Sequence, residues 1–196
     1  MAQPIRIGDL LKDKGFIGEA HIRYALQVQK VTQEKLGSVL TRIGLVSEFD
    51  LVNTLAEQLG LEYIDLSRVT PDNEVLKRFN RNLCLSHRLF PIRATDDGRI
   101  MVATNELPGD QLEQMVMRSS GLEPVFYMAE ESRVVSAIYN FFFFLENPVE
   151  ELIQREVKIL AGDSSLTVSP DNFINYLLLL AVKKRTSDIH IRPMEQ

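Results

Sequence analysis

The first 58 residues contain an internal repeat, and this repeat limits the possible folds more than any other feature of the sequence. One copy runs from Arg6 to Gln29 and the other from Lys35 to Gln58, with no insertion or deletion. A repeat of this length predicts two copies of one supersecondary unit, packed against each other. Similar residues recur at an offset of 29 positions: Arg6/Lys35, Gly8/Gly37, Leu11/Leu40, Gly15/Gly44, Ile17/Val46, Ile22/Leu51, Leu26/Leu55 and Gln29/Gln58.

Each copy predicts a short helix, a glycine turn and a longer helix. Gly15 and Gly44 lie four residues after the aliphatic pairs that end at Leu11 and Leu40, and they suit the left-handed conformation in which many helices end. Ser47 is a good N-cap for the longer helix of the second copy, and Gly18 takes the same position in the first. The apolar residues of each longer helix then recur at helical spacing.

Packing between helices is the simplest explanation for most of the apolar positions. It does not explain why each copy begins with a cation two residues before a glycine and ends with a glutamine. A glycine lets the backbone approach a ligand closely. The fork of Arg6 matches a phosphate or a guanine edge, and Gln29 and Gln58 can both donate and accept hydrogen bonds. The repeat therefore indicates a binding site for a small anion.

This pattern resembles the MshEN-type tandem cyclic di-GMP-binding domain at the N-terminus of type II secretion and type IV pilus assembly ATPases. The five-residue separator, Lys30–Glu34, reproduces the spacing of that family's paired motif. Lys35 stands where the motif has arginine, and it keeps the charge but loses the bidentate fork, so we expect a weaker second half-site. The resemblance implies a cyclic di-GMP site formed by Arg6, Ile7, Gly8, Leu11, Gly15, Ile22, Leu26, Gln29, Lys35, Leu36, Gly37, Leu40, Gly44, Leu51, Leu55 and Gln58.

The sequence predicts an α+β fold, in which an all-helical ligand-binding subdomain at residues 1–60 precedes a small α/β domain at residues 61–145. The segment Thr95-Asp-Asp-Gly98 favours the turn of a β-hairpin. Strands are predicted at 61–66, 90–94, 99–103 and 124–128. Helices are predicted at 69–79, 83–89, 110–117 and 131–144.

The sequence predicts a linker at residues 146–170, with a helix at 149–160. Residues 171–196 are predicted to be the start of a further domain, with a helix at 171–184. The segment Ser187-Asp-Ile-His190-Ile-Arg-Pro193 resembles the signature that opens the second N-terminal domain of the same ATPases. A structural role is the simplest interpretation of Asp188 and His190, because the sequence offers them no nearby nucleophile or second base. The chain stops at Gln196, where a further domain is expected to begin.

The sequence contains no Gly-x-x-x-x-Gly-Lys-Ser/Thr phosphate loop, so we predict that this chain is not itself an enzyme. ATP and Mg²⁺ are expected only in a C-terminal part of the ATPase that the chain does not contain. We expect no cofactor and no metal site, and Cys84, the only cysteine, excludes an internal disulfide.

Charge and hydropathy limit the possible partners and locations. The net charge is −5 and no basic stripe occurs, so binding to a long nucleic acid is not expected. No stretch approaches the ~20 apolar residues of a membrane span, and the N-terminus has no apolar signal-peptide core. We therefore expect a cytoplasmic protein that reaches the inner membrane only through partners.

Two functional hypotheses remain open. In the first, the chain is a regulatory region that binds cyclic di-GMP and couples it to a secretion or pilus motor. In the alternative, it is a docking module for the cytoplasmic domain of an inner-membrane platform protein, and the repeat is purely structural. A stand-alone enzyme is disfavoured by the missing motifs. The resemblance also implies a hexamer in the full-length ATPase.

Overall fold

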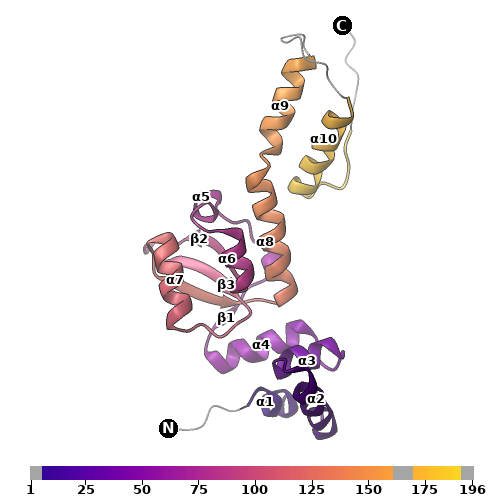
Figure 1. Ribbon diagram of the computed structural model, residues 1–196, viewed down its shortest axis with the longest axis vertical. Coiled ribbons are helices and arrows are strands. Elements are labelled where there is room, and N and C mark those ends of the chain that lie inside the picture. Colours follow the sequence, from indigo (N-terminus) through magenta and orange to yellow (C-terminus); the bar gives the residue numbers. More distant parts are fainter. Residues whose placement is uncertain (1–5, 161–169, 191–196) are drawn as a thin grey trace. The chain divides into compact units, whose positions relative to one another are not determined.

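The computed structural model describes residues 6–160 and 170–190 and has an α+β fold (Figure 1). The chain forms two compact units, which adjoin in sequence between Tyr139 and Asn140. The first unit holds the repeat helices and a small sheet, and the second holds C-terminal helices. Among the described residues, no helix combines the length and the hydrophobicity needed to cross a bilayer.

Four helices form the tandem repeat and confirm its predicted short–long pattern. The turns after the short helices are made by Gly15 (φ 78°) and Gly44 (φ 73°), both in the left-handed region that glycine tolerates. Ser47 caps the second long helix, because its Oγ accepts the N–H of Asp50 at 3.0 Å. The helices are α1 (Ile7–Asp13), α2 (Glu19–Thr32), α3 (Leu36–Arg42) and α4 (Glu48–Leu59).

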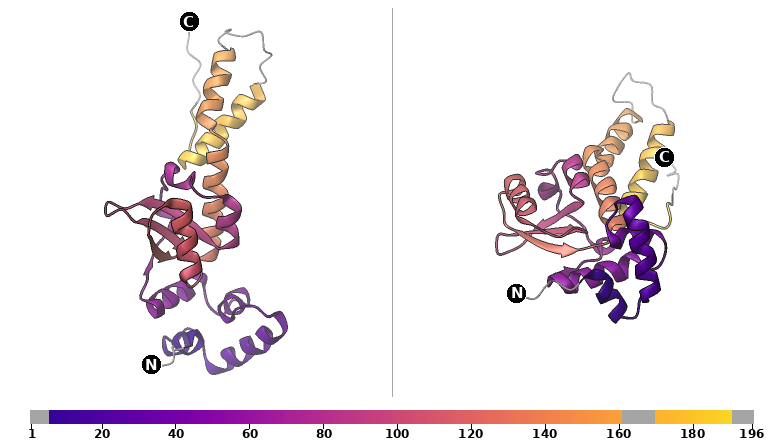
Figure 2. Two further views of the ribbon diagram at one scale, coloured as in Figure 1. Left: turned by 60° about the vertical axis from the view of Figure 1, so that its left-hand side comes forward. Right: turned by 60° about the horizontal axis from the view of Figure 1, so that its bottom comes forward.

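The two copies share one hydrophobic core. Equivalent residues of the repeat, such as Leu11 and Leu40, are both fully buried in it. Ile17 and Val46, which follow the two glycine turns, belong to the same cluster. The repeat is therefore a single packed body, and Figures 1 and 2 show its four helices grouped together with α4 nearest the sheet.

Within the described residues, four strands form one mixed sheet in the order β1-β4-β3-β2. Strands β2 and β3 pair antiparallel and confirm the predicted hairpin, whereas β4 is parallel to both β3 and β1. The strands are β1 (Glu62–Tyr63), β2 (Leu89–Ala94), β3 (Ile100–Thr104) and β4 (Pro124–Met128).

The 3₁₀ turn η1 and the helices α5 and α6 connect β1 to β2, α7 connects β3 to β4, and α8 follows β4. The core between helices and sheet includes Phe90, Val102, Val116 and Ile138, each fully buried. The bounds are η1 (Leu66–Arg68), α5 (Asn73–Leu76), α6 (Arg81–Ser86), α7 (Asp110–Ser120) and α8 (Glu131–Glu146). The predicted helices at 110–117 and 131–144 are confirmed and extend slightly further.

Three predicted elements differ from the structure. The helix expected at 69–79 is reduced to α5, because Asp72 caps it at Glu74 (2.8 Å) and donates its own N–H to the Ile92 carbonyl of β2. The helix expected at 83–89 is shifted to α6, since Arg88 adopts a left-handed conformation (φ 47°) and ends the turn before β2. The strand expected at 61–66 is limited to the two residues of β1.

The second unit contains α9 (Val149–Leu160) and α10 (Pro170–Lys184), which pack against each other. Both helices match their predicted positions closely. Lys183 joins them through an ion pair with Glu150 at 2.7 Å. Most of the predicted linker after α9, residues 161–169, and the end of the chain, residues 191–196, lie outside the described residues.

Candidate functional site

The first unit contains a cavity of about 500 Å³ between the second repeat copy and the α/β part. Helix α4 positions one wall, because its residues Val52 and Ala56 pack on Met128 of β4 and its residues Leu51 and Leu55 face the cavity. The lining residues are Ile7, Glu34, Lys35, Leu36, Gly37, Ser38, Thr41, Glu48, Leu51, Val52, Leu55, Arg88, Asn105, Glu106, Ala129, Glu130 and Glu131.

The cavity brings together one part of the site predicted from the sequence. Apart from Ile7, the predicted residues that line it all belong to the second copy of the repeat: Lys35, Leu36, Gly37, Leu51 and Leu55. Gly37 permits a close approach of α3 to α4, since a Cβ atom there would lie 3.0 Å from Leu51 Cδ2. The second copy is therefore the one that faces the α/β part.

The other predicted residues lie elsewhere in the repeat. Leu11 and Leu40 are buried in its core, Ile22 packs against that core, and Gly15 and Gly44 form the two turns. The Gly8 backbone lies next to the Leu36 and Ile22 side chains.

The remaining predicted residues do not line the cavity either. Gln29 closes the loop before α3 by donating from Nε2 to the Glu34 carbonyl at 2.8 Å. Arg6, Leu26 and Gln58 lie on the surface.

The opposite wall was not predicted from the sequence. It consists of residues that follow two neighbouring strands, Asn105 and Glu106 after β3 and the segment 129–131 after β4, together with Arg88 just before β2. Because β3 and β4 are parallel and pair from Ile100↔Pro124 to Thr104↔Met128, their carboxyl ends meet at one edge of the sheet. The pairing of these strands brings these residues together, and a single sequence does not show which strands are neighbours.

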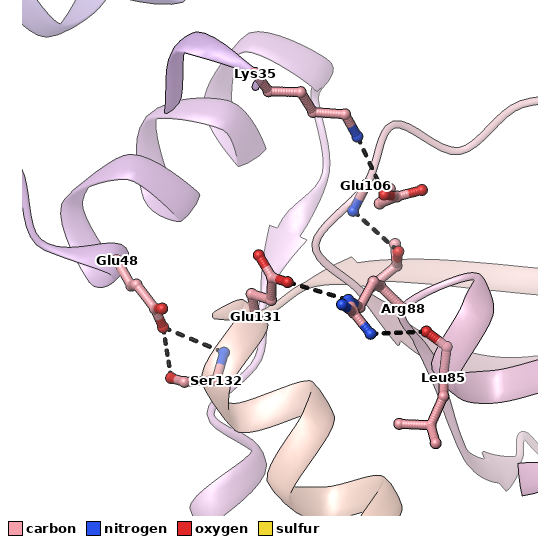
Figure 3. A network of polar contacts seen from close by, with 8 residues as sticks. Lys35, Glu48, Leu85, Arg88, Glu106, Glu131 and Ser132 are labelled. Carbon is pink, nitrogen blue, oxygen red and sulfur yellow. Dashed lines mark hydrogen bonds and ion pairs between the residues drawn. The ribbon is translucent and has the colours of Figure 1, made fainter. Parts of the chain in front are cut away.

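Ion pairs and hydrogen bonds connect the two walls of the cavity (Figure 3). Lys35 Nζ lies 3.1 Å from Glu106 Oε1, which joins the start of α3 to the loop after β3. The Glu48 carboxylate accepts from both the N–H (3.3 Å) and the hydroxyl of Ser132 at the start of α8. These contacts link the second repeat copy directly to the α/β part.

Arg88 and Glu130 are held by contacts within the α/β part. Arg88 donates from Nε to Glu131 Oε1 at 3.0 Å and from Nη1 to the Leu85 carbonyl at 2.9 Å. The Tyr63 hydroxyl donates to Glu130 at 3.1 Å. Burial, followed by the negative charge of Glu130, raises the pKa of Tyr63 to about 12, so this phenol remains a donor at neutral pH.

The lining combines three chemical properties. Leu36, Leu51 and Leu55 offer apolar surface, Lys35 and Arg88 offer positive charge, and five glutamates offer hydrogen-bond acceptors. A ligand with flat apolar faces, N–H edges and a small number of negative charges would match all three. Within residues 6–160 and 170–190, no group of three or more His, Cys, Asp or Glu side chains is arranged to hold a metal ion.

Comparisons with known proteins identify relatives of this chain. Residues 59–142 match the family model of the MshEN domain, so the match covers the α/β part rather than the repeat. The solved structure of MshE with cyclic di-GMP has a TM-score of 0.58 and 31% identity, and it covers 68% of this chain and 96% of that one.

Two curated relatives match nearly the whole of this chain. The type IV pilus assembly ATPase PilB of Myxococcus xanthus is 23% identical over 97% of this chain and 36% of its own length. The type II secretion system protein E of Xanthomonas campestris is 24% identical over 97% of this chain and 35% of its own length. This chain therefore spans about a third of the length of the curated relatives that it matches along its whole length.

Proposed function

Because this chain belongs to the MshEN family, the N-terminal region of type IV pilus assembly and type II secretion ATPases, we propose that it binds cyclic di-GMP in the cavity described above. One observation carries the proposal. The motif residues Lys35, Gly37 and Leu55 lie around a cavity of about 500 Å³, within the range of roughly 300–1,000 Å³ typical of small-ligand sites. The similar MshE structure contains cyclic di-GMP.

The chemistry of the lining supports this ligand. The leucines of α3 and α4 can cover the faces of a purine. Guanine presents N–H donors on its Watson–Crick edge, and the carboxylates across the cavity are acceptors for such donors. A phosphate of the ligand carries negative charge and would be attracted to the ammonium of Lys35.

The ion pair between Lys35 and Glu106 offers a way for the ligand to change how the repeat is linked to the α/β part. A ligand phosphate at Lys35 competes with the Glu106 carboxylate that holds this lysine at 3.1 Å. Ligand binding would then replace one link between the repeat and the α/β part. A ligand that prefers one arrangement of the two parts shifts their equilibrium. In the complete cytoplasmic, hexameric ATPase, this shift would bias the motor, whose ATP site belongs to the remainder of the protein.

A second candidate function is docking to the cytoplasmic domain of an inner-membrane platform protein. Large apolar side chains exposed on α2 favour it, because Tyr24 is 56% and Val31 85% exposed. Copurification with a platform protein that Tyr24→Ala and Val31→Ala abolish, in a chain that binds no cyclic di-GMP, would support docking alone. The two functions can also coexist on different surfaces.

Calorimetric titration with cyclic di-GMP tests the proposed function. We expect saturable binding that Lys35→Ala weakens about tenfold or more, since a charge-assisted hydrogen bond contributes roughly 1.5–3 kcal/mol. Lys30→Ala is the matched control, because Lys30 is exposed on α2 and does not line the cavity. Absence of heat up to high micromolar ligand, or equal affinities of wild type and Lys35→Ala, would refute the proposal. Arg6→Ala tests whether the first copy also contributes.

A further inference from the structure

We propose that Arg88, in the α/β part, is the second phosphate-binding cation of this site. The inference rests on the proposed function, because it concerns how the same cavity holds cyclic di-GMP. Lys35 and Arg88 are the two basic residues that line the cavity within the described residues. They reach it from different elements, Lys35 from the start of α3 and Arg88 from the residue before β2 (Figure 3).

The ligand requires more positive charge than Lys35 provides. Cyclic di-GMP carries two phosphodiesters on opposite sides of one ring, and a single ammonium cannot contact both closely. Five glutamates line the same cavity and disfavour an unpaired phosphate there. A second cation on another wall resolves this conflict, and Arg88 is the residue in that position.

The guanidinium of Arg88 is held in a fixed orientation before the ligand binds. Two of its nitrogens are engaged, Nε by Glu131 and Nη1 by the Leu85 carbonyl, and these bonds fix the plane of the group. The side chain remains 38% exposed. A planar guanidinium with further N–H donors is well suited to phosphate, and fixing it in advance reduces the entropy lost on binding.

The backbone of Arg88 supports a functional role. Its φ of 47° lies in the left-handed region, which a non-glycine residue adopts at an energetic cost. Glycine would meet the same backbone requirement with less strain. Strained residues of this kind are concentrated at binding sites, where the surrounding structure holds them in place. An arginine at this position therefore points to a use for the guanidinium itself.

Arg88 would also compensate for the lysine that the second repeat copy has at position 35. Lys35 stands at the position that Arg6 takes in the first copy, and it lacks a bidentate fork. Arg88 supplies that fork from the facing wall. The ligand then bridges the repeat and the α/β part through one phosphate contact on each, which makes the affinity depend on how the two parts are arranged.

The test compares the affinities of Arg88→Gly, Arg88→Lys and Arg93→Ala for cyclic di-GMP by calorimetry, in the intact chain. Glycine removes the guanidinium but suits the left-handed backbone, so thermal unfolding should stay close to that of wild type. Arg93, exposed on β2 and outside the cavity, is the matched control. We expect Arg88→Gly to weaken binding at least tenfold, Arg88→Lys to retain an intermediate affinity, and Arg93→Ala to match wild type.

Phosphorus NMR of the bound ligand separates a phosphate contact from a structural role. The two phosphates are equivalent in the free ligand and should give two resonances when one contacts Lys35 and the other Arg88. Arg88→Gly should shift one resonance and leave the other in place. The inference is overturned if wild type binds and the affinity of Arg88→Gly lies within twofold of the wild-type affinity. It is also overturned if both resonances move together in Arg88→Gly. If wild type shows no binding at all, the proposed function itself fails.

Discussion

At the scale of single residues, the two copies of the motif occupy unequal environments. A Cβ atom on Gly37 would meet Leu51 Cδ2 at 3.0 Å, closer than ordinary packing allows, whereas one on Gly8 would meet Leu36 Cδ2 at 3.4 Å. The sequence predicted that these glycines are equivalent, because it shows the repeat but not what each copy faces. The difference arises from the tight packing of α3 on α4.

We therefore predict different stabilities for Gly8→Ala and Gly37→Ala. Alanine gains up to about 1 kcal/mol over glycine within a helix, but overpacking typically costs roughly 1–3 kcal/mol. Gly8→Ala should be neutral or stabilising, and Gly37→Ala should be the less stable by about 1 kcal/mol or more in denaturant unfolding. Gly37→Ala should also bind cyclic di-GMP more weakly, because Leu51, which lines the cavity, has to shift to make room for the new Cβ atom. Equal stabilities of the two variants would contradict this packing.

The pKa of Tyr63 gives a second prediction at this scale. Burial is the main cause of its rise to about 12 and the charge of Glu130 is the next, so Glu130→Gln should lower the pKa while leaving it above 10. The folded state keeps the proton longer than the unfolded state, so stability from this group is complete below pH 10 and is lost as pH rises from 10 to 12. NMR titration of the tyrosine ring measures this, with Glu131→Gln as the control. A pKa of 10 or lower in Glu130→Gln would show that burial is not the main cause.

At the scale of secondary-structure elements, local signals in the sequence predicted the helices well wherever a cap or a turn residue marks the boundary. The glycine turns after α1 and α3 and the serine cap of α4 are such signals. The boundaries of α5 and α6 were not predicted, although Asp72 and Asn80 cap the starts of these helices. Contacts with distant parts of the chain accompany these boundaries, namely the bond from the Asp72 N–H to the Ile92 carbonyl of β2 and the bond from Arg88, just after α6, to Glu131.

The cap of α4 has a measurable consequence. Ser47→Ala removes the acceptor for the Asp50 N–H and should destabilise the first unit by about 1 kcal/mol, the usual effect of losing such a cap. Thermal unfolding would show a lower Tm for Ser47→Ala and no decrease for Ser136→Ala, an exposed serine within α8. An unchanged Tm in Ser47→Ala would mean that the cap contributes nothing to the stability of α4.

At the scale of the whole molecule, the repeat and its motif residues were predictable from the sequence, but only half of the cavity was. The missing wall depends on the parallel pairing of β3 with β4, which brings Glu106 and Glu131 opposite Lys35. Single-sequence patterns show strands but not their neighbours. The family model, in turn, matches residues 59–142 and misses the repeat. The proposed site needs both parts.

This requirement predicts how shortened chains behave. A chain that ends at Glu146, the last residue of α8, keeps every residue that lines the cavity and should bind cyclic di-GMP as the full chain does. A chain that begins at Leu59 keeps the segment matched by the family model but loses Lys35 and Leu55, and it should not bind. Calorimetry on both, with circular dichroism to verify folding, measures the outcome. Binding by the folded shorter chain would show that the repeat is dispensable.

Cyclic di-GMP is proposed to bind between the second repeat copy and the carboxyl ends of β3 and β4. Titrating the ¹⁵N-labelled chain with the ligand and following the backbone amides by NMR tests both binding and location. Binding at this site should give saturable shifts concentrated at residues 35–38, 51–55, 105–106 and 129–131. Shifts that do not saturate, or that leave these four segments unchanged while others move, would contradict it.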